Sequence, residues 1–213
     1  AIAKIGIATH LWNVQEEAVL GLEAALKNAG VSTDAYSKRL QNAASKIQSV
    51  SRHGDEAILA VMRLGIQMGI SADRIEDAAM AAAGLADVYG ISLDAAMKLV
   101  AKAQAGQYES LQELMPALKG MTTEAEKAAA VQKLLGDSWQ YSQDRAKTAS
   151  GAIAQMKNAL GDMEELIGKA IAPAIAALVQ SLNGFIMRAQ AFISGNEEMV
   201  GKLLLFGTAI VGL

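Results

Sequence analysis

The chain has 213 residues, of which 52% are hydrophobic but only 4% aromatic, and its formal net charge is −3. This charge offers no basic surface for nucleic acid, so we expect no sequence-specific nucleic-acid binding. The absence of Cys excludes disulfides, thiolate metal ligands and cysteine nucleophiles. A composition rich in Ala and Leu, with only two Pro, favours helices, and we expect an all-α fold.

Residues 1–136 are divided into short segments by residues that stop and start helices. Gly residues favour the left-handed conformation that ends a helix, and Ser, Thr, Asp and Asn side chains cap the start of the next one. The expected stops are Gly30, Gly69, Gly90 and Gly106, and the expected starts are Asn13, Ser71, Ser92 and Thr123. Asn13 with Glu16 and Thr123 with Glu126 also have the spacing of a capping box. We therefore predict a compact domain made of a small bundle of short helices.

Two five-residue segments of this domain differ at only one position. GISAD at residues 69–73 is followed by GISLD at residues 90–94. A tandem helical repeat would explain the pair, but solenoids need three or more units. Shared capping chemistry explains it equally well and is the interpretation that we favour.

Residues 137–193 predict a long, coiled-coil-like helix. Apolar residues alternate at spacings of four and three, which is the heptad pattern of helices that wrap around one another. We call this set the seam, and its members are Ala149, Ile153, Met156, Leu160, Met163, Ile167 and Ala170. It favours a parallel homo-oligomer of three or more copies, with a kink near Pro173. The alternative is a set of shorter helices broken at Gly151, Gly161 and Gly184.

The C-terminal region is poor in charge. No charged residue occurs between Ala170 and Met187, and residues 194–213 are expected to begin an apolar, membrane-active segment after a turn at residues 194–196. The predicted membrane contacts are Leu178, Phe185, Phe192, Leu203, Phe206 and Ile210. The core of a helix bundle would explain the same composition. Because the chain starts at Ala1 and stops within an apolar run, we expect it to be a segment of a longer protein.

The sequence contains no recognisable constellation for catalysis. His10 and His53 are the only histidines, and they predict solvated or capping side chains rather than a metal site or a triad. Arg145 and Lys147 fit the wet face of a coiled coil. We expect no enzyme activity, no cofactor and no metal.

Residues 148–168 (TASGAIAQMKNALGDMEELIG), followed by Ile171-Ala172-Pro173, resemble the segment that precedes the hydrophobic region of tail tape measure proteins in tailed bacteriophages. Residues 69–96 are similar to the small helical domain that these proteins place before that segment. The order of helical domain, long helix, Pro and charge-poor sequence also matches. The resemblance covers about residues 30–190 and depends on this order more than on any one motif.

The resemblance implies a structural virion protein that lies in the lumen of the phage tail, sets tail length and helps genome delivery through the host envelope. It implies several copies per tail, binding to tail tube and tail tip proteins, assembly chaperones in the host cytoplasm, and contact with the host inner membrane. Two other classes stay open. One is a pore-forming or membrane-perturbing helical toxin, and the other is a helical adaptor without a membrane role.

Overall fold

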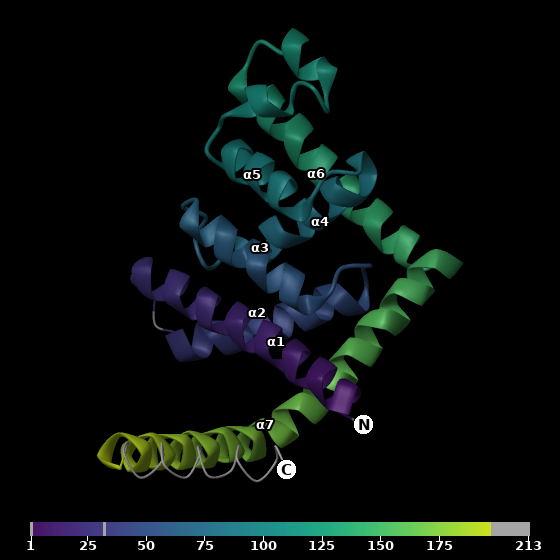
Figure 1. The fold of residues 1–213 in the computed structure, drawn as a ribbon. Coiled ribbons are helices and arrows are strands. Elements are labelled where there is room, and N and C mark those ends of the chain that lie inside the picture. The colour runs from purple at the N-terminus through teal and green to yellow at the C-terminus, as the bar shows by residue number, and fades with distance from the viewer. Residues whose placement is uncertain (1, 32, 197–213) are drawn as a thin grey trace, which may run out of the picture.

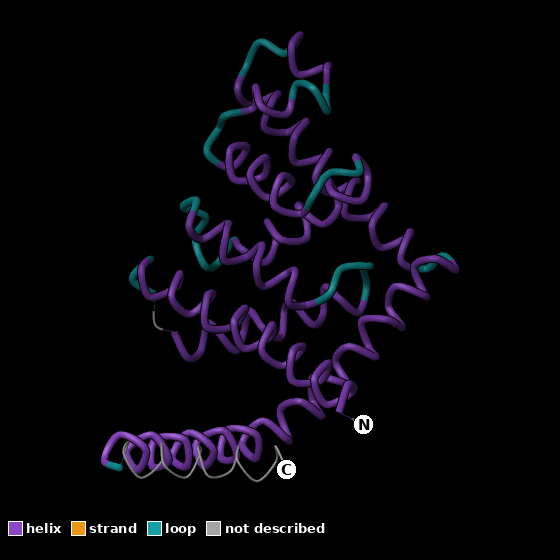
Figure 2. The backbone as a smooth tube through the Cα atoms, viewed as in Figure 1, coloured by secondary structure: helices purple, strands orange, loops and turns teal. Residues whose placement is uncertain are grey.

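The structure is a computed structural model that describes residues 2–31 and 33–196. Within these residues it contains helices, turns and bends but no strand, so the all-α prediction is confirmed. Figures 1 and 2 show a stack of helices joined by short loops, with one long helix at the C-terminal end. The helices are α1 (Ile2–Asn28), α2 (Thr33–Ser49), α3 (Asp55–Gln67), α4 (Ile75–Tyr89), α5 (Leu93–Gln104), α6 (Glu124–Ala146) and α7 (Ala149–Gly195), with 3₁₀ turns η1 (Tyr108–Leu111) and η2 (Pro116–Gly120) after α5.

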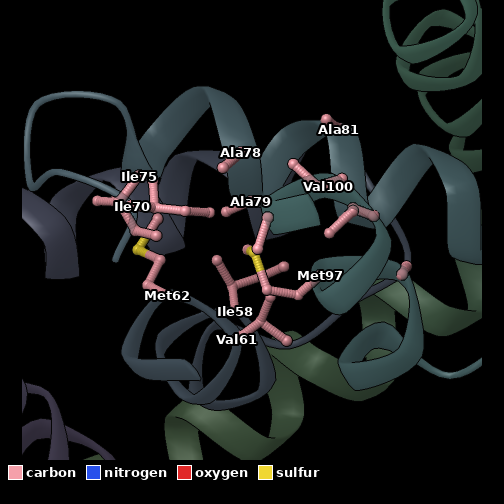
Figure 3. Close-up of a cluster of buried hydrophobic side chains, with 14 of the residues drawn as sticks. Ile58, Val61, Met62, Ile70, Ile75, Ala78, Ala79, Ala81, Met97 and Val100 are labelled. Carbon is pink, nitrogen blue, oxygen red and sulfur yellow. The ribbon is translucent and has the colours of Figure 1, made fainter. Parts of the chain in front are cut away.

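Helix α3 lies at the centre of the first five helices, because it packs against α1, α2, α4 and α5. Its apolar side chains enter a core to which all of these helices contribute. In Figure 3, Met62 lies near Ile70 and Ile75, and Val61 lies near Met97. Burying each such side chain is worth about 1.5–3 kcal/mol relative to its exposure in water. The largest fully buried side chains are Leu22, Leu26, Leu40, Ile58, Leu59, Met62, Ile75, Leu85, Met97, Leu111 and Leu118.

Helix α4 joins this core to α6 through small residues. Six of its ten buried residues are Ala, and Gly84 lies against the backbone of α6. A Cβ at Gly84 would lie 2.5 Å from the carbonyl carbon of Ser138 and from the nitrogen of Trp139, which is closer than real Cβ atoms come. The small side chains therefore let α4 and α6 pack backbone to backbone, and they leave little room for substitution.

Several predicted helix boundaries are confirmed. Gly30, Gly69, Gly90 and Gly106 all have positive φ angles between 66° and 90°. Ser92 caps α5 by accepting a hydrogen bond from the Ala95 amide at 3.2 Å. Thr123 and Glu126 form the predicted capping box at the start of α6.

Two predicted starts are wrong. Helix α1 runs through Asn13, because no Gly or Pro stop with a left-handed or fixed backbone interrupts residues 2–28. Helix α4 begins at Ile75 rather than at Ser71. Residues 71–74 form a turn in which the Arg74 amide donates to the Ser71 carbonyl at 2.9 Å. Asp73 in that turn accepts a hydrogen bond from the Tyr36 hydroxyl of α2 at 2.9 Å, so a tertiary contact delays the start of the helix.

The long C-terminal helix starts at Ala149, the first residue of the seam, and not at residue 137 as predicted. Helix α6 crosses the expected domain boundary at residue 136, and the chain turns at Lys147 and Thr148. Thr148 caps the new helix through the Gly151 amide and also donates to the Arg145 carbonyl at 2.7 Å. From Ala149 the helix is continuous for 47 residues, through Gly161, Pro173 and Gly184. Figure 1 shows that α7 changes direction along its length. Pro173 lies inside this helix, where its missing amide donor and its ring favour a kink.

Candidate interaction surface on helix α7

The predicted seam lies on the surface of the molecule. Every seam residue is exposed, and the large seam side chains retain between 50% and 58% of their accessible area. Gly151 and Gly168 are the buried residues of α7. Since contiguous apolar surface on a soluble monomer marks a binding surface, the seam is the candidate functional site of the described residues.

The opposite face of α7 packs against the rest of the protein. Helix α7 contacts α1 extensively and α2 and α6 less so. The buried or half-buried residues on this face are Gly151, Ala154, Gln155, Asn158, Gly161, Asp162, Glu165 and Gly168. With about 100° of rotation per residue, these positions lie roughly half a turn from the seam. We call this set the inner face, and it is made of small and polar residues where the seam is apolar.

Specific polar contacts hold the inner face. The Gln155 amide donates to the Ser49 carbonyl at 2.9 Å, and Gln48 donates to Asp162 at 2.7 Å. Farther along, the Lys169 ammonium lies 5.3 Å from the centre of the Trp12 ring, within the range of a cation–π interaction. These contacts fix the rotation of α7, and so they fix the seam on the outside.

Carboxyl groups gather where the inner face meets the start of α3. Burial and the neighbouring charge of Glu56 raise the pKa of Asp55 to about 6. Burial, followed by the charges of Asp55, Glu56 and Asp162, raises the pKa of Glu165 to about 7. The pKa of Asp162 is also raised, by burial and by Asp55. In the described part of the chain, no three His, Cys, Asp or Glu side chains, these carboxyl groups included, are placed so that they could hold a metal ion.

Beyond Lys169 the helix is exposed on nearly every side. The predicted membrane contacts Leu178, Phe185 and Phe192 all face solvent, and Phe185 retains 70% of its area. Helix α7 is long and apolar enough to cross a membrane by length and composition alone, and its most apolar window is not buried in the structure. Leu203, Phe206 and Ile210 lie outside the described residues.

A buried polar cluster joins α4, α6 and the loop before α3, and the sequence analysis missed it. The carboxylate of Asp87 accepts a hydrogen bond from the Ser142 hydroxyl at 2.5 Å and lies 3.5 Å from His53 Nε2 and 3.6 Å from Arg145 Nη1. His53 is thus largely buried beside a carboxylate, not solvated, whereas His10 is exposed. Arg145 likewise belongs to this cluster and not to a coiled-coil surface.

The cluster has the residue types of a hydrolase triad but not its connections. In a triad the His accepts the proton of the Ser, and the Asp orients the His. Here the Ser142 hydroxyl donates to Asp87, so the carboxylate occupies the central place. The geometry therefore holds α4 to α6 and does not activate a nucleophile. The one signal in the sequence was Asp87 within an otherwise Ala-rich helix.

Comparison with known protein families, with curated proteins and with solved structures finds no match to this chain.

Proposed function

We propose that this chain is a structural segment of a tail tape measure protein, and that it acts by self-association through the seam of α7. The single observation that carries the proposal is the exposure of a heptad-spaced apolar face on the side of α7 that points away from its own domain. An apolar face of this kind is covered in water by a partner of matching periodicity. A further copy of the same helix has that periodicity.

The arrangement of the domain agrees with such an assembly. Because the inner face and the seam lie on opposite sides of α7, copies of the helix can meet along the seam while each keeps its domain on the outside. The seam mixes Ile, Met, Leu and Ala without the alternation that favours dimers, which supports three or more copies. The resemblance of residues 69–96 and 148–173 to tape measure proteins supplies the biological setting: the tail lumen, with tube and tip proteins and chaperones as partners.

Disulfide cross-linking tests the parallel, in-register contact. The chain has no Cys, so one introduced thiol is the only one present. Met156→Cys places it on the seam, and Lys157→Cys places it on a neighbouring exposed position outside the seam. We expect oxidised Met156→Cys to form covalent dimers at micromolar concentration and Lys157→Cys to form few. Equal cross-linking of both variants would argue against the seam.

The length of the complete open reading frame tests the proposed role in setting tail length. A tape measure protein sets a length by its own extended length, so the chain must continue for many hundreds of residues with further helical heptads. A short complete chain would refute the assignment to this family while leaving self-association intact.

A second candidate function, membrane perturbation, is favoured by the exposed and uncharged stretch between Ala170 and Met187. Lys169 and Arg188 bracket this stretch, where their long side chains reach the headgroup region of a bilayer. Phe185→Asp should abolish dye release from liposomes, whereas Leu20→Asp, at an exposed site on α1, should not. Absence of release from the unmodified chain would remove this candidate.

A further inference from the structure

The inner face of α7 is connected to the domain by a chain of hydrogen bonds that spans four helices. Asp162 of α7 accepts from the side-chain amide of Gln48 in α2 at 2.7 Å. The other end of Gln48 accepts from the Asp55 amide at the start of α3 at 2.7 Å. Gln15 of α1 donates to the Asp55 carboxylate at 3.4 Å. Contact between α7 and the domain at this point therefore depends on polar groups. We call the residues that supply them the clasp, and its members are Gln15, Gln48, Asp55, Glu56, Asn158, Asp162 and Glu165.

The clasp is poor in positive charge. The charged groups that bear on Glu165 are Asp55 and Glu56 from α3, and Asp162 and Lys169 from α7 itself. The described clasp residues from α1 and α2, Gln15 and Gln48, carry no charge. Lys169 is the only cation of the set, and it lies over the Trp12 ring.

Some buried atoms of the clasp have no partner. Asp55 Oδ1, Gln15 Oε1 and Asn158 Nδ2 are buried without a hydrogen bond. Asp55 itself retains only 8% of its accessible area. Burying an ionised carboxylate without full hydrogen bonding is costly, and proximity to further carboxylates adds to the cost. Ionisation of the clasp carboxyl groups therefore destabilises the state in which α7 is docked on the domain.

We propose that the clasp is a proton-dependent latch, which holds the inner face of α7 on the domain when its carboxyl groups are protonated and releases it when they ionise. Release would free a second, small and polar face of α7 for partners while the seam stays available. The proposal does not depend on self-association, because the clasp and the seam lie on opposite sides of the helix.

Proton binding determines the direction in which pH changes the docking of α7. The pKa values of Glu165 and Asp162 are raised above their ordinary values of 4.5 and 3.8 when α7 is docked. The docked state therefore binds protons that the detached state releases. Docking is strongest below about pH 4, and it weakens as the pH rises towards the docked pKa of Glu165, about 7. Asp55 adds to this at its docked pKa of about 6, although the α3 N-terminus partly stabilises its charge.

Pulsed electron paramagnetic resonance tests the latch in the whole 213-residue chain. Spin labels on Lys38→Cys in α2 and Ala159→Cys in α7, both exposed positions, report the distance between the domain and α7. Excess unlabelled chain removes distances between copies. We expect one narrow distance at pH 5 and a second, longer and broader population at pH 8.5, while circular dichroism shows unchanged helix content.

Matched variants separate the latch from other effects of pH. Asp162→Asn with Glu165→Gln should keep the narrow distance at pH 8.5, whereas Glu164→Gln, which removes an exposed carboxylate of the same helix, should behave like the unmodified chain. The same results are expected in a Leu160→Asp/Ile167→Asp background that cannot associate. An unchanged distance between pH 5 and 8.5, or release of the Asp162→Asn/Glu165→Gln variant at pH 8.5, would overturn the proposal.

Discussion

Helices α1–α6 and helix α7 use similar apolar residues in opposite ways. Helix α4, with 15 residues, buries most of its apolar side chains against α3, α5 and α6. Helix α7, with 47 residues, buries Gly151 and Gly168, and it leaves its large apolar side chains in solvent. Docking through the small and polar inner face is what leaves the seam uncovered. The comparison shows that apolar periodicity predicts a face that will be covered, but not whether the same chain covers it.

A pair of leucine substitutions tests this difference between the domain and α7 most directly. Leu59 in α3 is fully buried and Leu160 on the seam is 50% exposed. Leu59→Ala should lower the free energy of unfolding by about 2–5 kcal/mol, because it removes apolar contacts and leaves a cavity. Leu160→Ala should change it by less than about 0.5 kcal/mol in the monomer. Urea denaturation at low protein concentration measures both, and equal losses would contradict the distinction between the regions.

Gly84 and Gly136 offer a second pair, within the domain itself. Gly84→Val places a branched side chain against the backbone of α6 and should cost at least about 1–3 kcal/mol of folding free energy. Gly136 in α6 is exposed, and a Cβ there meets nothing within 4 Å. Gly136→Ala should therefore stabilise the protein by about 0.5–1 kcal/mol. Thermal unfolding compares them. A tolerated valine at Gly84 would mean that α4 and α6 are not in backbone contact.

The contribution of the Asp87 cluster to the free energy of unfolding should depend on pH. Burial alone would raise its pKa, but His53, Ser142 and Arg145 outweigh burial and lower the pKa below its ordinary value of 3.8. Because the folded pKa is lowered, the stabilisation is present above pH 3.8 and is lost as the pH falls through the folded value.

Asp87→Asn should therefore cost about 1–3 kcal/mol of unfolding free energy at pH 7. This loss should shrink when the same urea titrations are repeated near pH 3. An equal loss at both pH values would show that the charge of Asp87 contributes nothing.

Removal of the two threonine helix caps should have the smallest effect on stability, and it tests whether the start of α7 unfolds together with the domain. Thr123→Ala at the start of α6 should cost about 1 kcal/mol of domain stability, as the loss of a helix cap usually does. Thr148→Ala removes the cap of α7 and should leave the urea midpoint of the domain unchanged. Its effect should instead be faster hydrogen exchange at Gly151 and Ala152. A comparable fall in domain stability in both variants would place the start of α7 within the cooperative unit.

Local chemistry accounts for the parts of the fold that the sequence predicts well. The left-handed glycines, the Thr123 capping box and the heptad spacing of the seam each depend on residues a few positions apart. The start of α4 was missed because Asp73 is engaged by Tyr36, 37 positions earlier in the chain. The break at Lys147–Thr148 was missed because a heptad pattern says nothing about where a helix bends back on its own domain.

The candidate site also has one part that local spacing predicts and another that depends on contacts between distant residues. The seam could be listed from spacing alone, but its exposure follows from contacts such as Gln155 with Ser49, which lie 106 positions apart. The inner face gave no sequence signal, since its Gly, Asn and acidic residues are also typical of a solvated helix face. The Asp87 cluster brings together three segments of the chain, and no spacing rule joins residues so distant.

Sedimentation equilibrium of the whole chain tests the central claim, that the exposed seam of α7 is an association surface. Over a range of concentrations up to several hundred micromolar, the unmodified chain should fit an equilibrium between monomer and an assembly of three or more copies. Leu160→Asp/Ile167→Asp should sediment as a monomer throughout, with hydrogen-exchange protection in α3–α5 unchanged. A monomeric unmodified chain at the highest concentration would contradict the account, and so would full association of the Asp variant.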